Sequence, residues 1–293
     1  MSTTTADPQV RRDSEYVIFW NEIMVPKFVR WKHILVDGLS HHSALVFPGL
    51  AVNPGDRAVD VGCGFGDTAI LLAGRVGPTG RVLGLDCCEA FLDYGRRDAA
   101  AAGLSNVDFA VADIETYPFE PDFDFCFSRF GTMFFANPVV ALRNMRRSLK
   151  PGGTMTMIVW RDLADNEVMA LPKAVVRRFL PPPGEEARSC GPGPFSMAEP
   201  DGVRAQLRAA GYEAPEFEAI DAPLVAGRTV EDAVAFQLAL GPAGEIVREA
   251  GELAVARRDE IVAALSEELR RFETPEGVVM SSGSWKVTAR NPG

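Results

Sequence analysis

The sequence predicts an α/β fold in which helices cover both faces of a doubly wound, mostly parallel sheet. A short apolar strand at residues 57–61 leads into a glycine-rich loop and then a helix that Asp67 or Thr68 can cap. Strand and helix patterns then alternate as far as residue 160. Two acids, Asp86 and Asp113, each end a strand of this series. With two later strands, we expect a seven-stranded sheet whose last strand is antiparallel.

The loop after the first strand is the strongest functional motif. Residues 60–66 read Asp-Val-Gly-Cys-Gly-Phe-Gly. Glycines allow sharp turns and leave backbone N–H groups open to a ligand at the start of a helix. A dinucleotide-binding fingerprint would need its third glycine where Asp67 stands, which weakens a nicotinamide interpretation. A turn between a core strand and a helix with no ligand is the other interpretation of this loop taken alone.

The acids at the strand ends indicate a nucleoside ligand. Asp86 ends the predicted strand 81–86, where a carboxylate can accept hydrogen bonds from both hydroxyls of a ribose. Asp113 ends the next strand, predicted at 106–114. Either acid alone is also consistent with a solvated strand end. Their spacing supports nucleoside binding without choosing the cofactor.

Composition excludes several classes of function. The chain has 293 residues, a net charge of −10 and 47% hydrophobic residues. An acidic protein is a poor general binder of nucleic acid, because neutralising phosphates needs a basic surface. No apolar run approaches the roughly 18 residues that a membrane span requires. The five cysteines show no C-x-x-C pattern and are expected to be reduced thiols of a cytoplasmic protein: Cys63, Cys87, Cys88, Cys126 and Cys190.

An aromatic-rich segment precedes the first strand. Large apolar residues recur at helical spacing between residues 16 and 35, interrupted by Pro26. Either they pack on the core or they form a lid over a ligand. If the helix continues through Gly38, His33 and His41 share one face with Asp37, and a carboxylate there would favour a histidine as general base. Histidines with no chemical role are the competing interpretation.

The chain after residue 161 is less regular. It predicts a turn-rich loop at 180–194, a helix at 199–210, a strand near 215–222 and a final strand pair at 277–290. Helices at 229–240 and about 245–272 are expected to form a cap. We therefore divide the chain into a helical lid (1–50), a cofactor-binding core (51–161) and a remainder with cap insertions (162–293).

Five motifs in order resemble the class I S-adenosylmethionine (SAM) dependent methyltransferases, which have a Rossmann-like fold. The likeness spans residues 55–161 and is nearest to the small-molecule branch that includes ubiquinone and menaquinone C-methyltransferases. The motifs are the glycine loop, the acid Asp86, Ala112-Asp113-Ile114, Ser128-Arg129-Phe130 and Leu149-Lys150-Pro151-Gly152-Gly153.

The resemblance implies SAM as cofactor and residue roles at matching positions. We expect no metal, because the histidines are not accompanied by a Cys or acid pattern with metal-ligand spacing. Asp86 would bind the ribose, Asp113 the adenine amino group, and Ser128 would line the cofactor. Residues expected to contact the cofactor are Asp60, Gly62, Cys63, Gly64, Asp86, Cys87, Asp113, Ile114 and Ser128. Candidates for catalysis are His33, His41 and Arg129. The chain has Phe127-Ser128-Arg129-Phe130 where other branches carry an Asn/Asp-Pro-Pro-Tyr/Phe tetrapeptide, which argues against methylation of nucleobase or glutamine amines.

The function expected from these features is methyl transfer from SAM to a small apolar or aromatic acceptor, by in-line displacement. We expect a small-molecule partner, no nucleic acid and no membrane span, and we consider a homodimer. The alternatives are a SAM-binding partner subunit without catalysis and a nicotinamide-dependent oxidoreductase.

Overall fold

The structure is a computed structural model that describes residues 15–184 and 191–293. Within these residues the chain forms an eight-stranded sheet of order β3-β2-β1-β4-β5-β8-β6, with the short strand β7 paired to β8 beside this path. β1 to β5 pair in parallel, whereas β8 is antiparallel to both β5 and β6. The predicted mostly parallel sheet with an antiparallel last strand is confirmed, with one short strand more than the seven expected. The strands are β1 (Arg57–Val61), β2 (Arg81–Asp86), β3 (Val107–Val111), β4 (Phe123–Arg129), β5 (Leu149–Trp160), β6 (Glu213–Gly227), β7 (Glu273–Thr274) and β8 (Gly277–Arg290).

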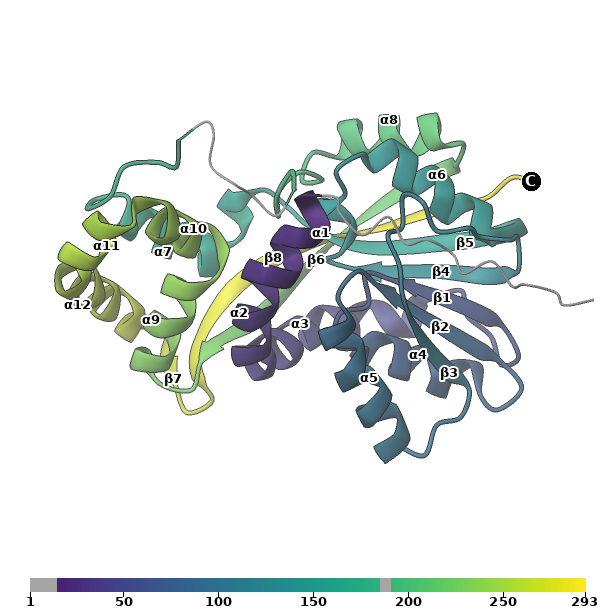
Figure 1. Cartoon of the computed structure of the whole chain (residues 1–293), viewed down its shortest axis with the longest axis horizontal. Helices are drawn as coiled ribbons and strands as arrows, with labels where there is room; N and C mark the ends of the chain where they lie inside the picture. The colour runs from purple at the N-terminus through teal and green to yellow at the C-terminus, as the bar shows by residue number, and fades with distance from the viewer. Residues whose placement is uncertain (1–14, 185–190) are drawn as a thin grey trace, which may run out of the picture.

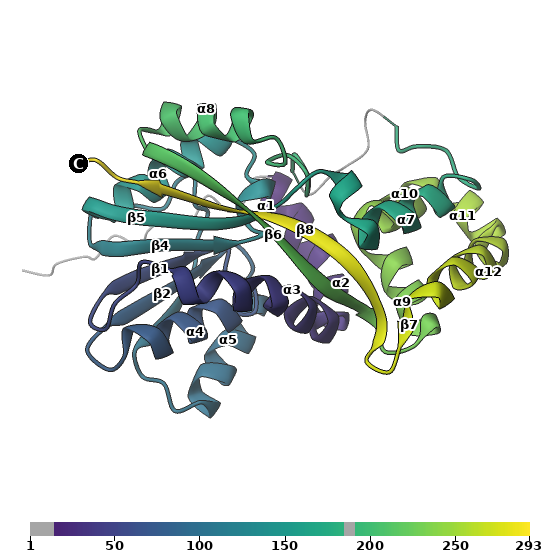
Figure 2. The same cartoon turned by 180° about the vertical axis from the view of Figure 1, so that it is seen from behind.

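Helices cover both faces of this sheet (Figures 1 and 2). One face carries α3, α4 and α5, and the other carries α6 and α8. The helices of the core are α3 (Lys32–Val46), α4 (Asp67–Val76), α5 (Glu89–Ala101), α6 (Pro138–Ser148) and α8 (Pro200–Ala210). Because both faces are covered, the central strand β1 is buried from Ala58 to Val61, as a parallel strand between two helical layers requires.

A second group of helices forms a lobe at one end of the molecule (Figure 1). It consists of α7 (Glu167–Val176), α9 (Val230–Ala239), α10 (Gly241–Ala250), α11 (Glu252–Ala256) and α12 (Arg258–Leu269). β6 and β8 stay paired from Glu213 opposite Arg290 to Gly227 opposite Val278. This ribbon extends beyond the other strands and carries the lobe (Figures 1 and 2).

The N-terminal helices lie between the lobe and the core sheet (Figure 1). They are α1 (Glu15–Phe19), a π-helical turn (Trp20–Met24), α2 (Val25–Arg30) and α3. The predicted interruption occurs where Pro26 stands in the first turn of α2. α3 continues through Gly38, which lies so close to β6 that a Cβ there would stand 3.1 Å from Cγ of Leu224. The ring of Trp31 packs edge-on against Phe236 of the lobe, which joins the two helical regions.

Two sequence expectations need correction. The helix predicted over about 245–272 is three helices, α10 to α12, because Gly251 adopts φ +52° and ψ −121°, a conformation that ends α10. The motif Leu149-Lys150-Pro151-Gly152-Gly153, whose Pro-Gly-Gly run is typical of a helix stop and turn, is instead the start of β5. The pairing register with β4 shifts there between Phe123 and Phe125. The expectation for Cys190 lies outside the described residues, and the other four cysteines are free thiols.

None of the helices in the described part of the chain combines the length and the apolar character needed to cross a membrane.

Candidate functional site

The glycine loop forms one wall of a large cavity. β1 ends at Val61, and Gly62, Gly64 and Gly66 all have positive φ before α4 begins at Asp67. Gly64 lines the cavity with φ +53°, and no neighbouring atom lies within 4 Å of the place where its Cβ would be. The open space next to bare backbone can therefore take a ligand. The loop N–H groups from Gly62 to Gly64, which the sequence suggested would be open to a ligand, instead donate to Leu85 and Asp86.

Asp86 at the end of β2 is held by the backbone on both of its oxygens. The N–H of Gly64 donates to Oδ2 at 2.9 Å, and the N–H of Cys88 donates to Oδ1 at 3.0 Å. Burial raises the pKa of Asp86 to about 6, and these two donors oppose the rise. The carboxylate is thus largely ionised at neutral pH, and each oxygen can accept a further hydrogen bond.

Asp113 lies just beyond β3 and also faces the cavity, together with Ile114. Its Oδ1 accepts a hydrogen bond from the N–H of Glu115 at 3.0 Å, which fixes the turn that follows the strand. Two acids and a bare loop therefore meet at the carboxyl ends of adjacent strands. This donor and acceptor set suits a ribose, a base amino group and an amino-acid tail, so the residues present fit SAM.

The cavity has a volume of about 600 Å³ and extends from the glycine loop to the helical lobe. Away from the loop its wall is mainly aromatic and aliphatic. These side chains come from the N-terminal helices, the strand ends and the lobe: Trp20, Met24, Phe28, Phe130, Met133, Phe134, Trp160, Phe195, Phe236 and Leu240. A space of this size and character can hold a drug-sized apolar molecule in addition to polar groups at the loop.

The predicted site residues divide into those that line the cavity and those that do not. Eight line it: Gly62, Cys63, Gly64, Asp86, Cys87, Asp113, Ile114 and Arg129. Asp60 is fully buried beneath the loop, where it accepts a hydrogen bond from the Thr68 hydroxyl at 2.5 Å. Ser128 is buried next to Gly131, at a place where a Cβ on that glycine would lie 3.1 Å from the Ser128 hydroxyl oxygen. Asp60 and Ser128 therefore pack behind the glycine loop and the end of β4 and do not line the cavity.

Arg129 is bound within the wall. Its guanidinium forms an ion pair with Asp67 at 2.8 Å and donates to the hydroxyl of Ser43 at 3.0 Å, and its side chain is 8% exposed. Asp67 is the first residue of α4 and engages Arg129, whereas Gly66 occupies the capping position. The expectation that Asp67 caps the helix is therefore wrong. Thr68 is equally occupied, because its hydroxyl donates to Asp60.

The three histidines lie in different environments on α3. His33 and His41 are exposed, and neither is among the residues that line the cavity. His42 is buried, with Nδ1 2.9 Å from the Ser284 hydroxyl and Nε2 2.9 Å from the Ser282 hydroxyl. Burial and the nearby Arg129 charge lower the pKa of His42 to about 4, so the ring is neutral at physiological pH.

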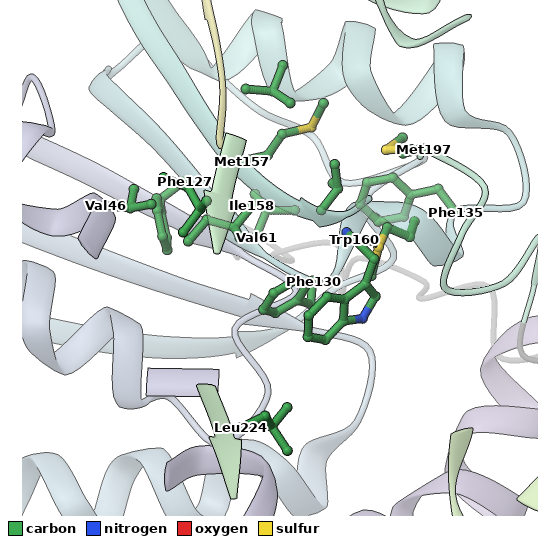
Figure 3. Packing of buried hydrophobic residues seen from close by; sticks show 14 of the residues in the cluster. Val46, Val61, Phe127, Phe130, Phe135, Met157, Ile158, Trp160, Met197 and Leu224 are labelled. Carbon is green, nitrogen blue, oxygen red and sulfur yellow. Dashed lines mark hydrogen bonds between the residues drawn. The ribbon is translucent and has the colours of Figure 1, made fainter. Parts of the chain in front are cut away.

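His42 supports an aromatic stack in the cavity wall. Phe130 and Trp160 stack with ring centroids 3.9 Å apart, as Figure 3 illustrates. The edge of His42 meets both rings, at 5.4 and 5.2 Å. Phe130 has φ +55°, which is rare for a bulky residue and marks local strain at a functional position. The sequence placed all three histidines in one helical segment but did not single out His42, because its hydrogen-bond partners come from β8.

Sequence reasoning also missed the contribution of the lobe. Phe236, Gln237, Leu240 and Glu245 from α9 and α10 line the cavity, as does Lys173 from α7. Nothing in their local pattern separates them from an ordinary amphipathic helix face. Only the folding of the lobe over the sheet edge brings them to the site.

Comparison with known proteins identifies the core. The family described as "Methyltransferase domain" matches residues 58–153. The matched segment runs from β1 to the first residues of β5. The predicted resemblance to class I SAM-dependent methyltransferases of the quinone-biosynthesis type is confirmed, and the match supports S-adenosyl-L-methionine as the cofactor.

Curated relatives extend the likeness beyond this domain. Demethylmenaquinone methyltransferase of Staphylococcus aureus strain JH9 is 33% identical over 157 residues, which cover 52% of this chain and 63% of the relative. The same enzyme of strain Newman matches equally. The chain therefore spans less than two thirds of the length of these relatives.

Solved structures share the fold. The Haemonchus contortus phosphoethanolamine N-methyltransferase 2 in complex with S-adenosyl-L-methionine has a TM-score of 0.56 at 17% identity, covering 96% of this chain and 61% of that one. The YcgJ protein of Bacillus subtilis has a TM-score of 0.53 at 19% identity, covering 86% and 99%. At sequence identities this low, the similarity shows a shared fold.

Buried Asp60 makes the stability of the folded chain depend on pH. Burial raises its pKa to about 7, so between pH 4 and 7 the native state binds more protons than the unfolded state, and stability falls as pH rises. We expect Asp60→Asn to gain unfolding free energy relative to wild type across this range. Urea unfolding from pH 4.5 to 8, with Asp98→Asn as a surface control, measures it; a constant difference would contradict the assignment.

His42 produces the opposite trend. Because its pKa is lowered to about 4, the unfolded state binds more protons between about pH 4 and 6.5, and stability rises with pH there. We expect the advantage of wild type over His42→Phe to grow across this range and to level off above pH 7. The same unfolding series provides the measurement, with exposed His41→Phe as the matched control. A difference that shrinks with rising pH would be inconsistent with a neutral, hydrogen-bonded ring.

Proposed function

We propose that this protein transfers the methyl group of SAM to a small, largely apolar or aromatic acceptor. The observation that carries this proposal is a cavity of about 600 Å³ that joins the two strand-end acids to an aromatic chamber reaching the lobe. When bound, the cofactor supplies an electrophilic methyl group on a sulfonium. The acceptor gains this methyl and loses a proton, and a thioether is the other product.

The chain's own residues position the reactants. The ionised carboxylate of Asp86 accepts hydrogen bonds from the ribose hydroxyls, and Asp113 accepts from the adenine amino group. The bare backbone at Gly64 lies next to the amino-acid tail. The stacked rings of Phe130 and Trp160 exclude water and offer a flat apolar surface. Holding an acceptor in line with the methyl group in this dry space is the main catalytic contribution.

No base is assigned among the residues that line the cavity. Asp67 is paired with Arg129, and Glu245 is paired with Arg248. We propose that Arg129 acts by holding Asp67 and the strand tip in place. His33 and His41, exposed on α3, would serve as base only through solvent. An acceptor that loses its proton to water, such as a phenol, does not need a base in the cavity wall.

The relatives favour an aromatic acceptor. The Staphylococcus aureus proteins are named demethylmenaquinone methyltransferases, and the aromatic wall is suited to a flat ring. A partner subunit that binds SAM without turnover is less well supported, because the chamber extends well beyond the cofactor contacts. The methyltransferase domain match favours SAM over a nicotinamide cofactor. A cytoplasmic location, the lack of nucleic-acid binding and a homodimer stay predictions.

Asp86→Asn should weaken binding of S-adenosylhomocysteine by roughly ten- to a hundredfold, since hydrogen bonds to a charged acceptor contribute about 1.5–3 kcal/mol. Isothermal titration calorimetry on the purified protein measures this. Asp98→Asn is the matched control, because Asp98 on α5 pairs with Lys32 at the surface. Unchanged affinity in Asp86→Asn would contradict the ribose assignment.

Methyl transfer itself is tested with radiolabelled SAM and a panel of quinols, phenols, polyketides and amines. We expect label to enter an aromatic or apolar acceptor and S-adenosylhomocysteine to form in equal amount. His33→Ala and His41→Ala should keep wild-type turnover on that acceptor. Transfer only to protein or RNA would overturn the small-molecule proposal.

A further inference from the structure

The acidic side chains that line the cavity are already engaged with the protein near the lobe and strand tip. Asp67 is paired with Arg129. Glu245 forms an ion pair with Arg248, which also binds Glu249 at 2.6 Å. These carboxylates are therefore matched by cations of the chain itself and do not require a positively charged ligand.

Lys173 differs from the other lysines of the chain. It lies on α7, half-buried, and lines the cavity one helical turn from Met169, which also lines it. Within the described residues, Lys173 makes neither an ion pair nor a side-chain hydrogen bond. In contrast, three of the other four lysines pair with acids: Lys32 with Asp98, Lys150 with Asp124 and Lys286 with Glu218. The fourth, Lys27, also has an interaction partner.

An unpaired ammonium at the wall of an apolar cavity is an unusual arrangement. Burying a charge costs free energy unless an opposite charge compensates it, and the half-buried Lys173 has no such partner within the described residues. Lysine can keep its head in water while its methylene stem covers apolar surface, but here the residue faces the same space as Phe236 and Leu240. A ligand anion would compensate the charge at this position.

We propose that the acceptor of this enzyme is an apolar or aromatic carboxylic acid whose carboxylate binds Lys173. This assignment rests on the proposed methyl transfer and names the class of its substrate. Asp86 and Asp113 lie at the carboxyl ends of β2 and β3, whereas α7 belongs to the lobe (Figure 1). Lys27, Arg129 and Glu245 also line the cavity, but each already has an interaction partner in the protein. A carboxylate is repelled by Asp86 and Asp113 and attracted by the unpaired Lys173, and this difference in charge orients the acceptor. The carboxylate faces the lobe, and the far end of the molecule faces the methyl group.

The test compares naphthoate with naphthamide, its neutral analogue of nearly the same shape, in the presence of saturating S-adenosylhomocysteine. Calorimetry on the full-length protein should show naphthoate binding at least about tenfold more tightly, since hydrogen bonds to charged groups contribute that much. Lys173→Met keeps the apolar stem and removes the charge, and we expect it to reduce naphthoate affinity to that of the amide. Lys173→Arg should retain the preference. Lys150→Met, at a surface ion pair on β5, is the matched control and should behave as wild type.

The outcomes separate the two proposals. If wild type binds S-adenosylhomocysteine but shows no preference for naphthoate, or if Lys173→Met keeps the preference, the carboxylate assignment is overturned and methyl transfer is unaffected. If wild type does not bind S-adenosylhomocysteine, the proposed function fails. Unchanged S-adenosylhomocysteine affinity in Lys173→Met shows that the variant is folded. A preference lost in Lys150→Met as well would overturn the assignment by showing a general effect of charge.

Discussion

The carboxylate of Asp86 is the interaction on which the site depends. Its two oxygens bind the N–H groups of Gly64 and Cys88, so one side chain joins the loop after β1 to the start of α5. The parallel pairing of β1 with β2 places these segments next to each other. Without a carboxylate at this position, the buried N–H of Cys88 and the partly buried N–H of Gly64 would lose their acceptor, and the loop would lose the contact that sets its shape.

The cavity wall beyond this anchor is held rigidly. Phe130 follows β4 in a left-handed conformation that costs about 1–3 kcal/mol in general. Its N–H donates to the carbonyl of Ile158 at 2.8 Å, and its ring stacks on Trp160 with His42 behind both. These contacts offset the strain and keep the aromatic surface in one orientation. A wall that is ordered before binding spends less free energy on ordering itself when a ligand enters.

The lobe and the N-terminal helices complete the enclosure because β6 and β8 are long. Their paired extension carries α7 and α9 to α12 past the sheet edge, and α1 to α3 fill the space between (Figures 1 and 2). The consequence is a cavity with different charge at its two ends. The core contributes acids suited to the cofactor, and the lobe contributes the unpaired Lys173 together with Glu245, whose charge is matched by Arg248.

The sequence by itself determined the α/β fold, the glycine loop and the strand-end acids Asp86 and Asp113. These features depend on alternating patterns and on spacing within short segments, and such local patterns can be recognised from the sequence alone. It also identified α3 as a helix that carries all three histidines. The helix break at Gly251 was missed, because a single glycine inside a long helical pattern is often tolerated.

Only the tertiary structure decided which histidine is buried, what Arg129 binds and which residues enclose the second half of the cavity. His42 is held by Ser282 and Ser284 of β8, and Arg129 by Asp67 of α4 and Ser43 of α3. Lys173 reaches the cavity through the packing of the lobe. Each of these contacts joins segments far apart in the chain. Sequence periodicity does not predict these contacts, because they form only when the sheet order brings those segments together.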